Sequence, residues 1–313
     1  MSEGRPRLIA IVGPTASGKS ALADEVAARL GSSVVSVDSM QVYRGMDIGT
    51  AKEPEEFRSV PLLMVDVADV RSDYSVQVFQ RDARACVDTL LEDDKVPVLC
   101  GGTGLYLDAV IDEMDFPRGT TNGAVRRKYE EMGRQRGAAA LWEMLRQRDA
   151  RSAELIHPNN VRRVERALEL LDEGTSYAKE HEGLKRHIPH YAASIFATVR
   201  RREELYKRID ARVDAMMAAG LVDEVKALLD QGLRESTTAA QAIGYKEVVE
   251  YLDGHCDLEK CVETIKLRSR RYAKRQLSWI RRDGRAQEVD LDAMTVAEAA
   301  EFVIDGFKND GDE

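Results

Sequence analysis

A glycine-framed loop after a short apolar run constrains this chain more than any other feature. Residues 8–12 are all apolar, residues 21–30 have a helical pattern, and between them lies Gly13-Pro14-Thr15-Ala16-Ser17-Gly18-Lys19-Ser20. A strand, the pattern G-x-x-x-x-G-K-[ST] and a helix in this order are typical of a P-loop. Its amides, the helix N-terminus and Lys19 can hold a phosphate or diphosphate, and the Ser20 hydroxyl can hold Mg²⁺. The alternative is a glycine-rich turn without a ligand.

Short β-branched runs alternate with helical patterns through the first 115 residues. The predicted elements here are strands at 8–12, 33–37, 62–67 and 96–100 and helices at 21–30, 75–91 and from 105 onward. Such alternation is typical of right-handed βαβ units, a parallel sheet and ligands at the carboxyl ends of the strands. We therefore predict an α/β fold with a P-loop NTPase-like parallel sheet core. The P-loop, Asp38 and Thr103 each follow a strand and should converge on one crevice.

The pattern changes in the middle of the chain. We assign residues 1–115 to the first part of the core, and 116–190, which are helical and arginine-rich, to a helical insertion subdomain. Residues 191–313 complete the core. The later predicted elements are strands at 192–199 and 287–291 and helices at 202–219, 221–231, 239–252, 258–281 and from 295 onward.

Charge is unevenly distributed along the chain. The net charge of −9 argues against a protein that coats nucleic acid indiscriminately. Residues 118–200 nevertheless carry 16 basic and 11 acidic side chains. Between Lys266 and Arg285, nine basic residues stand against one acid, Asp283. A basic insertion and a basic helix on an acidic body indicate a local anionic partner such as structured nucleic acid.

Cysteine spacing and hydropathy indicate the cellular setting. The four cysteines and five histidines form no disulfide or metal pattern. The apolar run at residues 8–12 is too short for a signal peptide, and no run is long enough to span a membrane. We therefore expect a cytoplasmic protein with reduced cysteines and no membrane association.

Several side chains near the predicted crevice could have chemical roles. Asp38 could ligate a metal, act as a base or cap the following turn. Thr103 could bind substrate or cap a helix, and Asp66 could act as a Walker-B-like carboxylate. Arg212 could pack its stem at the edge of an apolar stripe or reach the anion. In the basic helix, Tyr272 and Trp279 share a face, which a helix with a core-facing Trp would also produce.

Six motifs together resemble the tRNA dimethylallyltransferase family and occur in its order along nearly the whole chain. They are the P-loop at 13–20 and the segments 38–52, 101–106, 163–169, 241–246 and 274–281. The resemblance implies transfer of a dimethylallyl group from its diphosphate to N6 of the adenosine on the 3′ side of the anticodon. It implies that residues 13–20 hold the diphosphate, with Mg²⁺ on Ser20.

The resemblance also implies roles for individual residues. Asp38 would be the base, Arg212 would bind the diphosphate, and Thr103 would bridge the two substrates. The anticodon arm of tRNA would be bound by Asp38, Ser39, Met40, Gln41, Thr103, Arg126, Arg162, Arg163, Val164, Glu165, Arg166, Gln241, Gly244, Tyr245, Lys246, Lys274, Arg275, Gln276, Trp279 and Arg281. We expect a monomer in which residues 116–190 clamp the tRNA.

The chain departs from the family pattern in two places, and other functions stay open. Leu62 and Leu63 stand where the family usually has a histidine pair, and Ser20 replaces the commoner Thr. The alternatives are an adenylate isopentenyltransferase acting on AMP or ATP, a P-loop kinase of a small molecule, and a non-enzymatic RNA-binding protein. The long basic surface favours tRNA, because a mononucleotide does not need one.

Overall fold

The computed structural model describes residues 4–114, 116, 123–183 and 187–310. These residues form two compact units, one of residues 1–112 with 189–313 and the other of residues 113–188. The second unit begins and ends within about three residues of the predicted insertion. Among the described residues, no helix combines the length and the hydrophobicity that a bilayer span needs.

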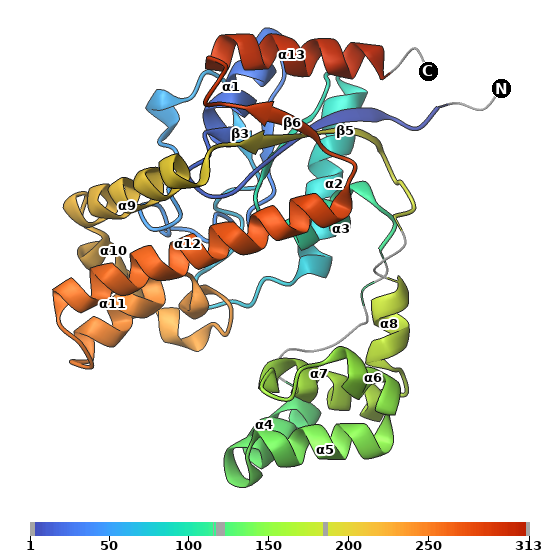
Figure 1. The fold of residues 1–313 in the computed structure, drawn as a ribbon, viewed down its shortest axis with the longest axis vertical. Helices are drawn as coiled ribbons and strands as arrows, with labels where there is room; N and C mark the ends of the chain where they lie inside the picture. Colours follow the sequence, from blue (N-terminus) through green and yellow to red (C-terminus); the bar gives the residue numbers. More distant parts are fainter. Residues whose placement is uncertain (1–3, 115, 117–122, 184–186, 311–313) are drawn as a thin grey trace. The chain divides into compact units, whose positions relative to one another are not determined.

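The first unit is built on a six-stranded parallel sheet (Figure 1). Its order is β3-β2-β4-β1-β5-β6. The strands are β1 (Arg7–Val12), β2 (Val34–Ser36), β3 (Leu62–Leu63), β4 (Val98–Gly101), β5 (Ala192–Val199) and β6 (Gln287–Asp290). Central β1 pairs with both β4 and β5, so that Ile9 lies opposite Val98 and Ser194. The prediction of an α/β fold with a parallel sheet is confirmed.

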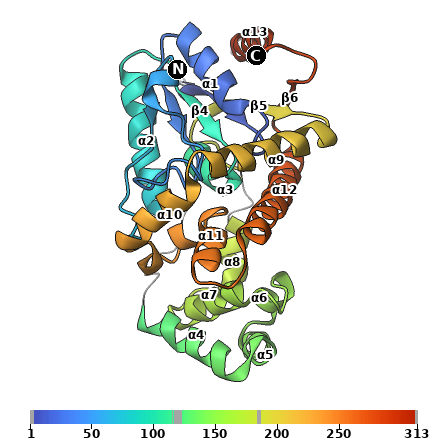
Figure 2. The same cartoon turned by 90° about the vertical axis from the view of Figure 1, so that its left-hand side faces the viewer.

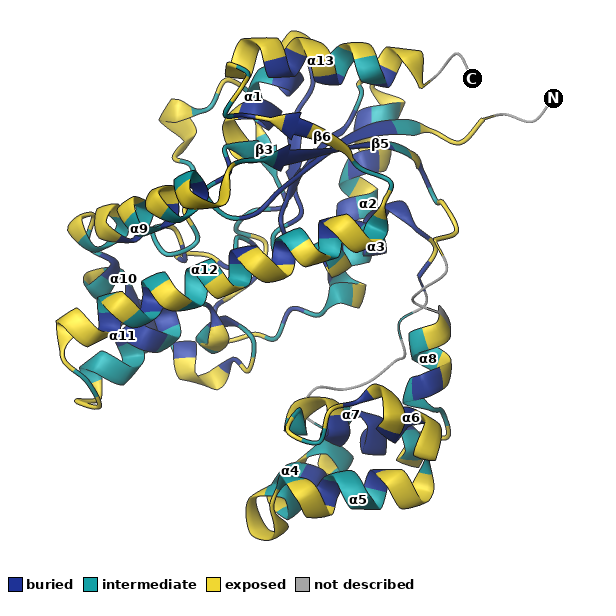
Figure 3. Cartoon of the chain, viewed as in Figure 1, coloured by how far each residue is buried: buried dark blue, intermediate teal, exposed yellow. Residues whose placement is uncertain are grey.

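Apolar helices cover both faces of the sheet, because successive strand residues point to opposite sides. Ile9, Ile11 and Phe196 pack against α1 (Lys19–Arg29) and α13 (Val296–Asn309). Leu8, Ala10 and Val12 belong to the other core cluster. That cluster includes side chains of α2 (Val76–Glu92), α3 (Gly104–Ile111), α10 (Leu221–Asp230), α11 (Tyr245–Leu252) and α12 (Leu258–Asp283). Figure 3 shows the resulting buried strands and the exposed outer faces of the helices.

Helix α9 (Arg202–Ala218) packs along α12 (Figure 2). Leu205 and Ile209 of α9 meet Ala273 of α12 in a small apolar cluster of their own. This contact brings residues separated by more than sixty positions to one side of the cavity described below. The long basic helix is therefore fixed to the core by its apolar face.

The second unit contains α4 (Ala124–Arg136), α5 (Ala138–Arg148), α6 (Ala150–Leu155), α7 (Val161–Asp172) and α8 (Tyr177–Gly183). Its core includes Tyr129, Leu145 and Leu168. The Tyr129 hydroxyl donates to Asp172 at 2.7 Å and accepts from Arg148 at 2.7 Å. The unit therefore has a hydrophobic core and a partly buried polar link between α4, α5 and α7.

Two predicted elements are shorter than expected. The strand predicted at 62–67 stops at Leu63, because Met64 and Asp66 have positive φ angles of 61° and 58°. The helix predicted at 239–252 is split into a 3₁₀ turn (Ala239–Gln241) and α11 by Gly244, whose φ is 96°. The positive φ angles of these residues are compatible neither with an extended strand nor with a continuous right-handed helix. Two further 3₁₀ turns lie at Glu55–Phe57 and Leu233–Glu235.

Candidate active site

A cavity of about 890 Å³ lies at the carboxyl ends of the strands in the first unit. Its lining includes the P-loop, the segment after β2, and faces of α9 and α12. Lys19, Ser20, Asp38 and Arg212 all line it. The crevice expected from the strand order therefore contains the P-loop and Asp38, whereas Thr103, also expected there, is not among its lining residues. The cavity is large enough for a small organic ligand.

The P-loop leaves amides available to an anion. Gly18 occupies the N-cap position of α1 with φ of 102°, and no side chain caps that end. The first-turn amides of a helix have no partner within it, so they can bind an anion. A Cβ atom at Gly13 would lie 2.0 Å from Thr198 Oγ1, which leaves no room for a side chain. Lys19 Nζ donates to the Pro14 carbonyl at 3.3 Å.

Buried Gln276 joins the P-loop to the turn after β4. Its Oε1 accepts from the Thr15 amide at 2.9 Å, and its Nε2 donates to the Gly102 carbonyl at 2.9 Å. A Cβ atom at Gly102 would lie 2.1 Å from Nε2, so the contact needs a glycine. Gln276 was predicted to bind tRNA. In the structure its amide is committed to fixing the two loops against each other.

Asp38 combines two of the roles that were left open, whereas Thr103 does not cap its helix through its side chain. Asp38 Oδ1 accepts from the Met40 amide at 2.8 Å, which closes a turn, and the side chain also lines the cavity. Thr103 stands at the N-cap position of α3 but makes no capping hydrogen bond through its side chain. Its hydroxyl lies 3.5 Å from that of Tyr272, whose pKa is raised by burial. The Thr103 hydroxyl is therefore not used in holding its own helix.

Two cations near Asp38 are poorly solvated. Burial lowers the pKa of Lys19, and the nearby Arg212 lowers it further. Burial also lowers the pKa of Arg212, while Asp38 acts in the opposite direction. Two partly buried cations near one carboxylate favour an added anion, because the anion would replace part of their lost hydration.

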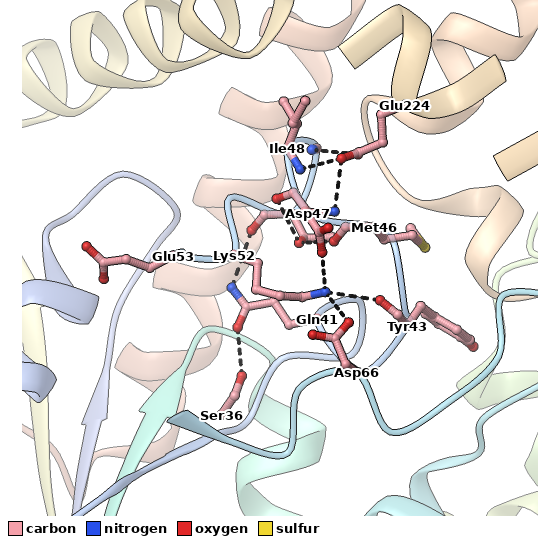
Figure 4. Close-up of polar contacts among 12 residues, drawn as sticks. Ser36, Gln41, Tyr43, Met46, Asp47, Ile48, Lys52, Glu53, Asp66 and Glu224 are labelled. Carbon is pink, nitrogen blue, oxygen red and sulfur yellow. Dashed lines mark hydrogen bonds and ion pairs between the residues drawn. The ribbon is translucent and has the colours of Figure 1, made fainter. Parts of the chain in front are cut away.

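Asp66 does not take the position of a Walker-B-like carboxylate. It is absent from the cavity lining and pairs with Lys52 at 2.6 Å (Figure 4). The early end of β3 and the positive φ of Asp66 turn the chain away from the sheet edge. That alternative is therefore wrong.

The residues predicted to bind tRNA divide by exposure. Val164 and Tyr245 are fully buried, and Glu165 is nearly so, with its pKa raised by burial. Trp279 packs against Gly104 and donates to Asp108 at 3.3 Å. The exposed members are Arg162, Arg163, Gln241, Lys274, Arg275 and Arg281. Because Val164, Glu165 and Tyr245 are buried, their side chains cannot contact a phosphate, and we withdraw these three residues as tRNA contacts.

Sequence reasoning missed several lining residues, including Arg208 and Cys100. Arg208 Nε donates to the Ala16 carbonyl at 3.0 Å. It precedes Arg212 by one helical turn, and this i, i+4 spacing could have indicated it. Cys100 is buried at the end of β4, where burial raises its pKa to about 11 and Lys19 opposes that shift. No spacing pattern marks a single cysteine of this kind.

A P-loop, a neighbouring carboxylate and partly buried cations at the carboxyl ends of a parallel sheet define a P-loop enzyme that binds a phosphorylated substrate. Comparison with known families is more specific. The family model described as IPP transferase matches residues 41–283, and the one described as isopentenyl transferase matches residues 6–67. The chain belongs to the tRNA dimethylallyltransferase family, which confirms the predicted family and its prenyltransferase activity.

Individual relatives agree with this assignment. The tRNA dimethylallyltransferase of Carboxydothermus hydrogenoformans is 43% identical over 300 residues, which cover 95% of this chain and 96% of that one. The corresponding protein of Geobacillus thermodenitrificans is 44% identical over 277 residues, covering 88% and 87%. A crystal structure of tRNA isopentenylpyrophosphate transferase from Bacillus halodurans has a TM-score of 0.72 and 39% identity over 98% of this chain and 99% of that one. A eukaryotic dimethylallyltransferase acting on tRNA has a TM-score of 0.76 and 27% identity, covering 91% and 74%.

Proposed function

We propose that this enzyme transfers a dimethylallyl group from dimethylallyl diphosphate to N6 of the adenosine on the 3′ side of the anticodon, with release of diphosphate. The observation that supports this reaction most is that the P-loop with Lys19, Arg212 and Asp38 all line one cavity. An anion site and a carboxylate in one space are what a transfer from a diphosphate to an amine requires.

The donor side is formed by the P-loop and the two partly buried cations, Lys19 and Arg212. As the allylic C–O bond breaks, negative charge grows on the leaving diphosphate, and the amides, Lys19 and Arg212 stabilise that charge. Mg²⁺ fits the same place, because the Ser20 hydroxyl lines the cavity and this ion prefers oxygen ligands. When bound, the ion would add positive charge beside the leaving group.

The acceptor side is formed by Asp38 and Thr103. The lone pair of adenine N6 is delocalised into the ring, so the amine is a poor nucleophile. Asp38 accepts the N6 proton as the new C–N bond forms. The hydroxyl of Thr103, which lies 3.5 Å from that of Tyr272 in the cavity wall, holds the adenosine beside the donor. The base must leave its stack to enter, which is easiest in a single-stranded loop.

The basic helix provides a surface for the anticodon arm. Ion pairs neutralise its first half, where Lys266 contacts Asp214, Arg268 contacts Glu247 and Arg270 contacts Asp210. Among the residues that the structure describes, no acid pairs with exposed Lys274 or Arg281. These unpaired cations are the ones that can exchange counterions for phosphates.

The insertion contributes further cations to the proposed tRNA surface. Arg162 and Arg163 are exposed on α7. Arg126 pairs with Glu130 at 3.6 Å, and Arg166 pairs with buried Glu169 at 2.6 Å. We therefore assign the phosphate contacts of this unit first to Arg162 and Arg163. The clamping role of the insertion, the monomeric state and the cytoplasmic location remain predictions.

The test is a comparison of acceptors with one donor. The purified protein is incubated with dimethylallyl diphosphate and Mg²⁺ together with unmodified tRNA, an anticodon hairpin, AMP or ATP. We expect diphosphate release and prenylated adenosine, detected by mass spectrometry of nucleosides, only with the two RNAs. Prenylated AMP with unmodified RNA would identify an adenylate isopentenyltransferase, and phosphate transfer from ATP would identify a kinase.

A further inference from the structure

A carboxylate from a distant helix is bound by three consecutive backbone amides of the segment after β2. Glu224 of α10 accepts from the amides of Asp47, Ile48 and Gly49 at 3.1, 2.7 and 3.2 Å (Figure 4). Successive amides that converge on one anion form a strong, charge-assisted contact. This contact ties residues 47–49 to a helix more than 170 positions later in the chain.

The Glu224 carboxylate is itself held from behind. The buried Tyr245 donates its hydroxyl to Glu224 at 2.6 Å. The Tyr245 ring lies so close to Gly49 that a Cβ atom there would be 2.4 Å from the ring. Tyr245 therefore restricts the rotation of the Glu224 carboxylate, and its ring packs closely against Gly49 of the segment that Glu224 binds.

Lys52 anchors the other end of the same segment. Its side chain is only 4% exposed and forms ion pairs with Asp47 and Asp66, each at 2.6 Å. Its ammonium group also donates to the Tyr43 carbonyl at 3.2 Å (Figure 4). Residues 47–52 are thus fixed at both ends by charged groups.

The carbonyl of Thr50 lies between these two anchors and reaches the cavity. It accepts from Arg212 Nη2 and from Gln41 Nε2, both at 3.4 Å. Gln41 is held in turn by the Ser36 hydroxyl, which donates to its Oε1 at 2.8 Å. Thr50 is a hydrogen-bond acceptor for Arg212 in the cavity, so its position affects where that guanidinium points.

We propose that Glu224 is a positioning residue of the transfer reaction. By binding the amides of residues 47–49 it fixes the Thr50 carbonyl, and this carbonyl orients Arg212 toward the donor diphosphate. Glu224 does not itself line the cavity. The proposal rests on the proposed function, because it requires that Arg212 bind the diphosphate.

The first experiment measures donor and tRNA kinetics for Glu224→Gln. Glutamine keeps the shape and one acceptor oxygen but loses the charge that three amides share. We expect the KM for dimethylallyl diphosphate to rise about tenfold while the KM for tRNA stays within about twofold. The matched control is Asp223→Asn, an exposed acid in the same helical turn, which should change neither value.

The second variant removes one contact without disturbing the packing. Tyr245→Phe keeps the ring beneath Gly49 but removes the hydroxyl that donates to Glu224. We expect a smaller rise in donor KM, about twofold to threefold, in the same direction. An unchanged donor KM in Glu224→Gln would overturn the proposal, whatever the result for Tyr245→Phe.

A double-mutant cycle with Arg212 separates positioning from general structural support. If Glu224 acts through Arg212, Glu224→Gln should not raise the donor KM further in an Arg212→Ala background. Effects that multiply would show that Glu224 acts independently, and the proposal would be wrong. If Arg212→Ala alone left the donor KM unchanged, the diphosphate role of Arg212 and the positioning role of Glu224 would both be rejected. Impairment by Arg212→Ala with a normal Glu224→Gln would reject only the positioning role.

Discussion

Two loops meet in the active-site cavity, and they use their backbone amides in opposite ways. The P-loop at residues 13–20 leaves the first-turn amides of α1 without a capping side chain. The loop at residues 38–53, which we call the Asp38 loop, binds a carboxylate of the protein itself through the amides of residues 47–49. One loop is arranged to receive an external anion, and the other has already bound an internal one.

The difference shows how each loop acquires its shape. Glycines and the neighbouring strand and helix determine the P-loop, although Gln276 supports it from α12. The Asp38 loop depends on Glu224, on buried Lys52 and on Tyr245 beneath Gly49. Changes in the P-loop should therefore affect donor binding directly. Changes in the Asp38 loop should affect the acceptor chemistry, the stability of the fold or, through Thr50 and Arg212, donor binding indirectly.

The largest effect is expected from Asp38→Asn. Asparagine keeps the oxygen that accepts from the Met40 amide, so the turn is preserved, but it cannot accept the N6 proton. We expect kcat to fall about a thousandfold with nearly unchanged donor affinity. Single-turnover kinetics and donor titration would measure the two quantities. Near-normal turnover would remove Asp38 as the base.

A smaller loss is expected from Lys19→Met, which tests the donor side of the comparison. The substitution keeps a long side chain but removes one of the two partly buried cations. We expect kcat/KM for the donor to fall about a hundredfold, because charge on the leaving diphosphate is less stabilised. tRNA affinity, measured by filter binding, should not change. A selective loss of tRNA affinity would reverse the roles assigned to the two loops.

Lys52→Met tests how much the fold depends on the internal ion pairs. The change removes the hydrogen bond from Lys52 to the Tyr43 carbonyl, which still accepts from the Met46 amide, and removes the cation between Asp47 and Asp66. We expect the free energy of unfolding to fall by about 2 kcal/mol, less than for fully buried pairs because both carboxylates are half exposed. Urea denaturation measures this loss. Lys226→Met, which breaks an exposed pair, is the control and should cost under about 0.5 kcal/mol.

The smallest change in rate is expected from the basic helix, which lies outside both loops. The double variant Lys274→Ala/Arg281→Ala should weaken tRNA binding and lower the slope of log affinity against log salt by about 1.5. Donor KM should stay unchanged. Arg270→Ala is the control, because its charge is already paired with Asp210. An unchanged slope in the double variant would place the tRNA surface elsewhere.

Much of the fold could be predicted from local patterns in the sequence. Strands β1, β4 and β5, the P-loop and the long helices follow from apolar periodicity, β-branched runs and turn residues. The short β3 and the break at Gly244 could not, since both depend on single residues with positive φ. For the site, the motifs indicated Lys19, Asp38 and Arg212, and strand order indicated that they converge. They did not indicate that Tyr245 and Val164 are buried.

The sequence by itself determined the family, the sheet core and the anion-binding loop. Each motif, strand or loop that indicates them is a short segment whose residues are close together in the chain. Only the tertiary structure decided that Gln276 bridges two loops, that Lys52 is buried, and that Glu224 holds the Asp38 loop. These contacts join residues from about 14 to 261 positions apart. Their partners are chosen by packing in three dimensions, which leaves no periodic pattern along the chain.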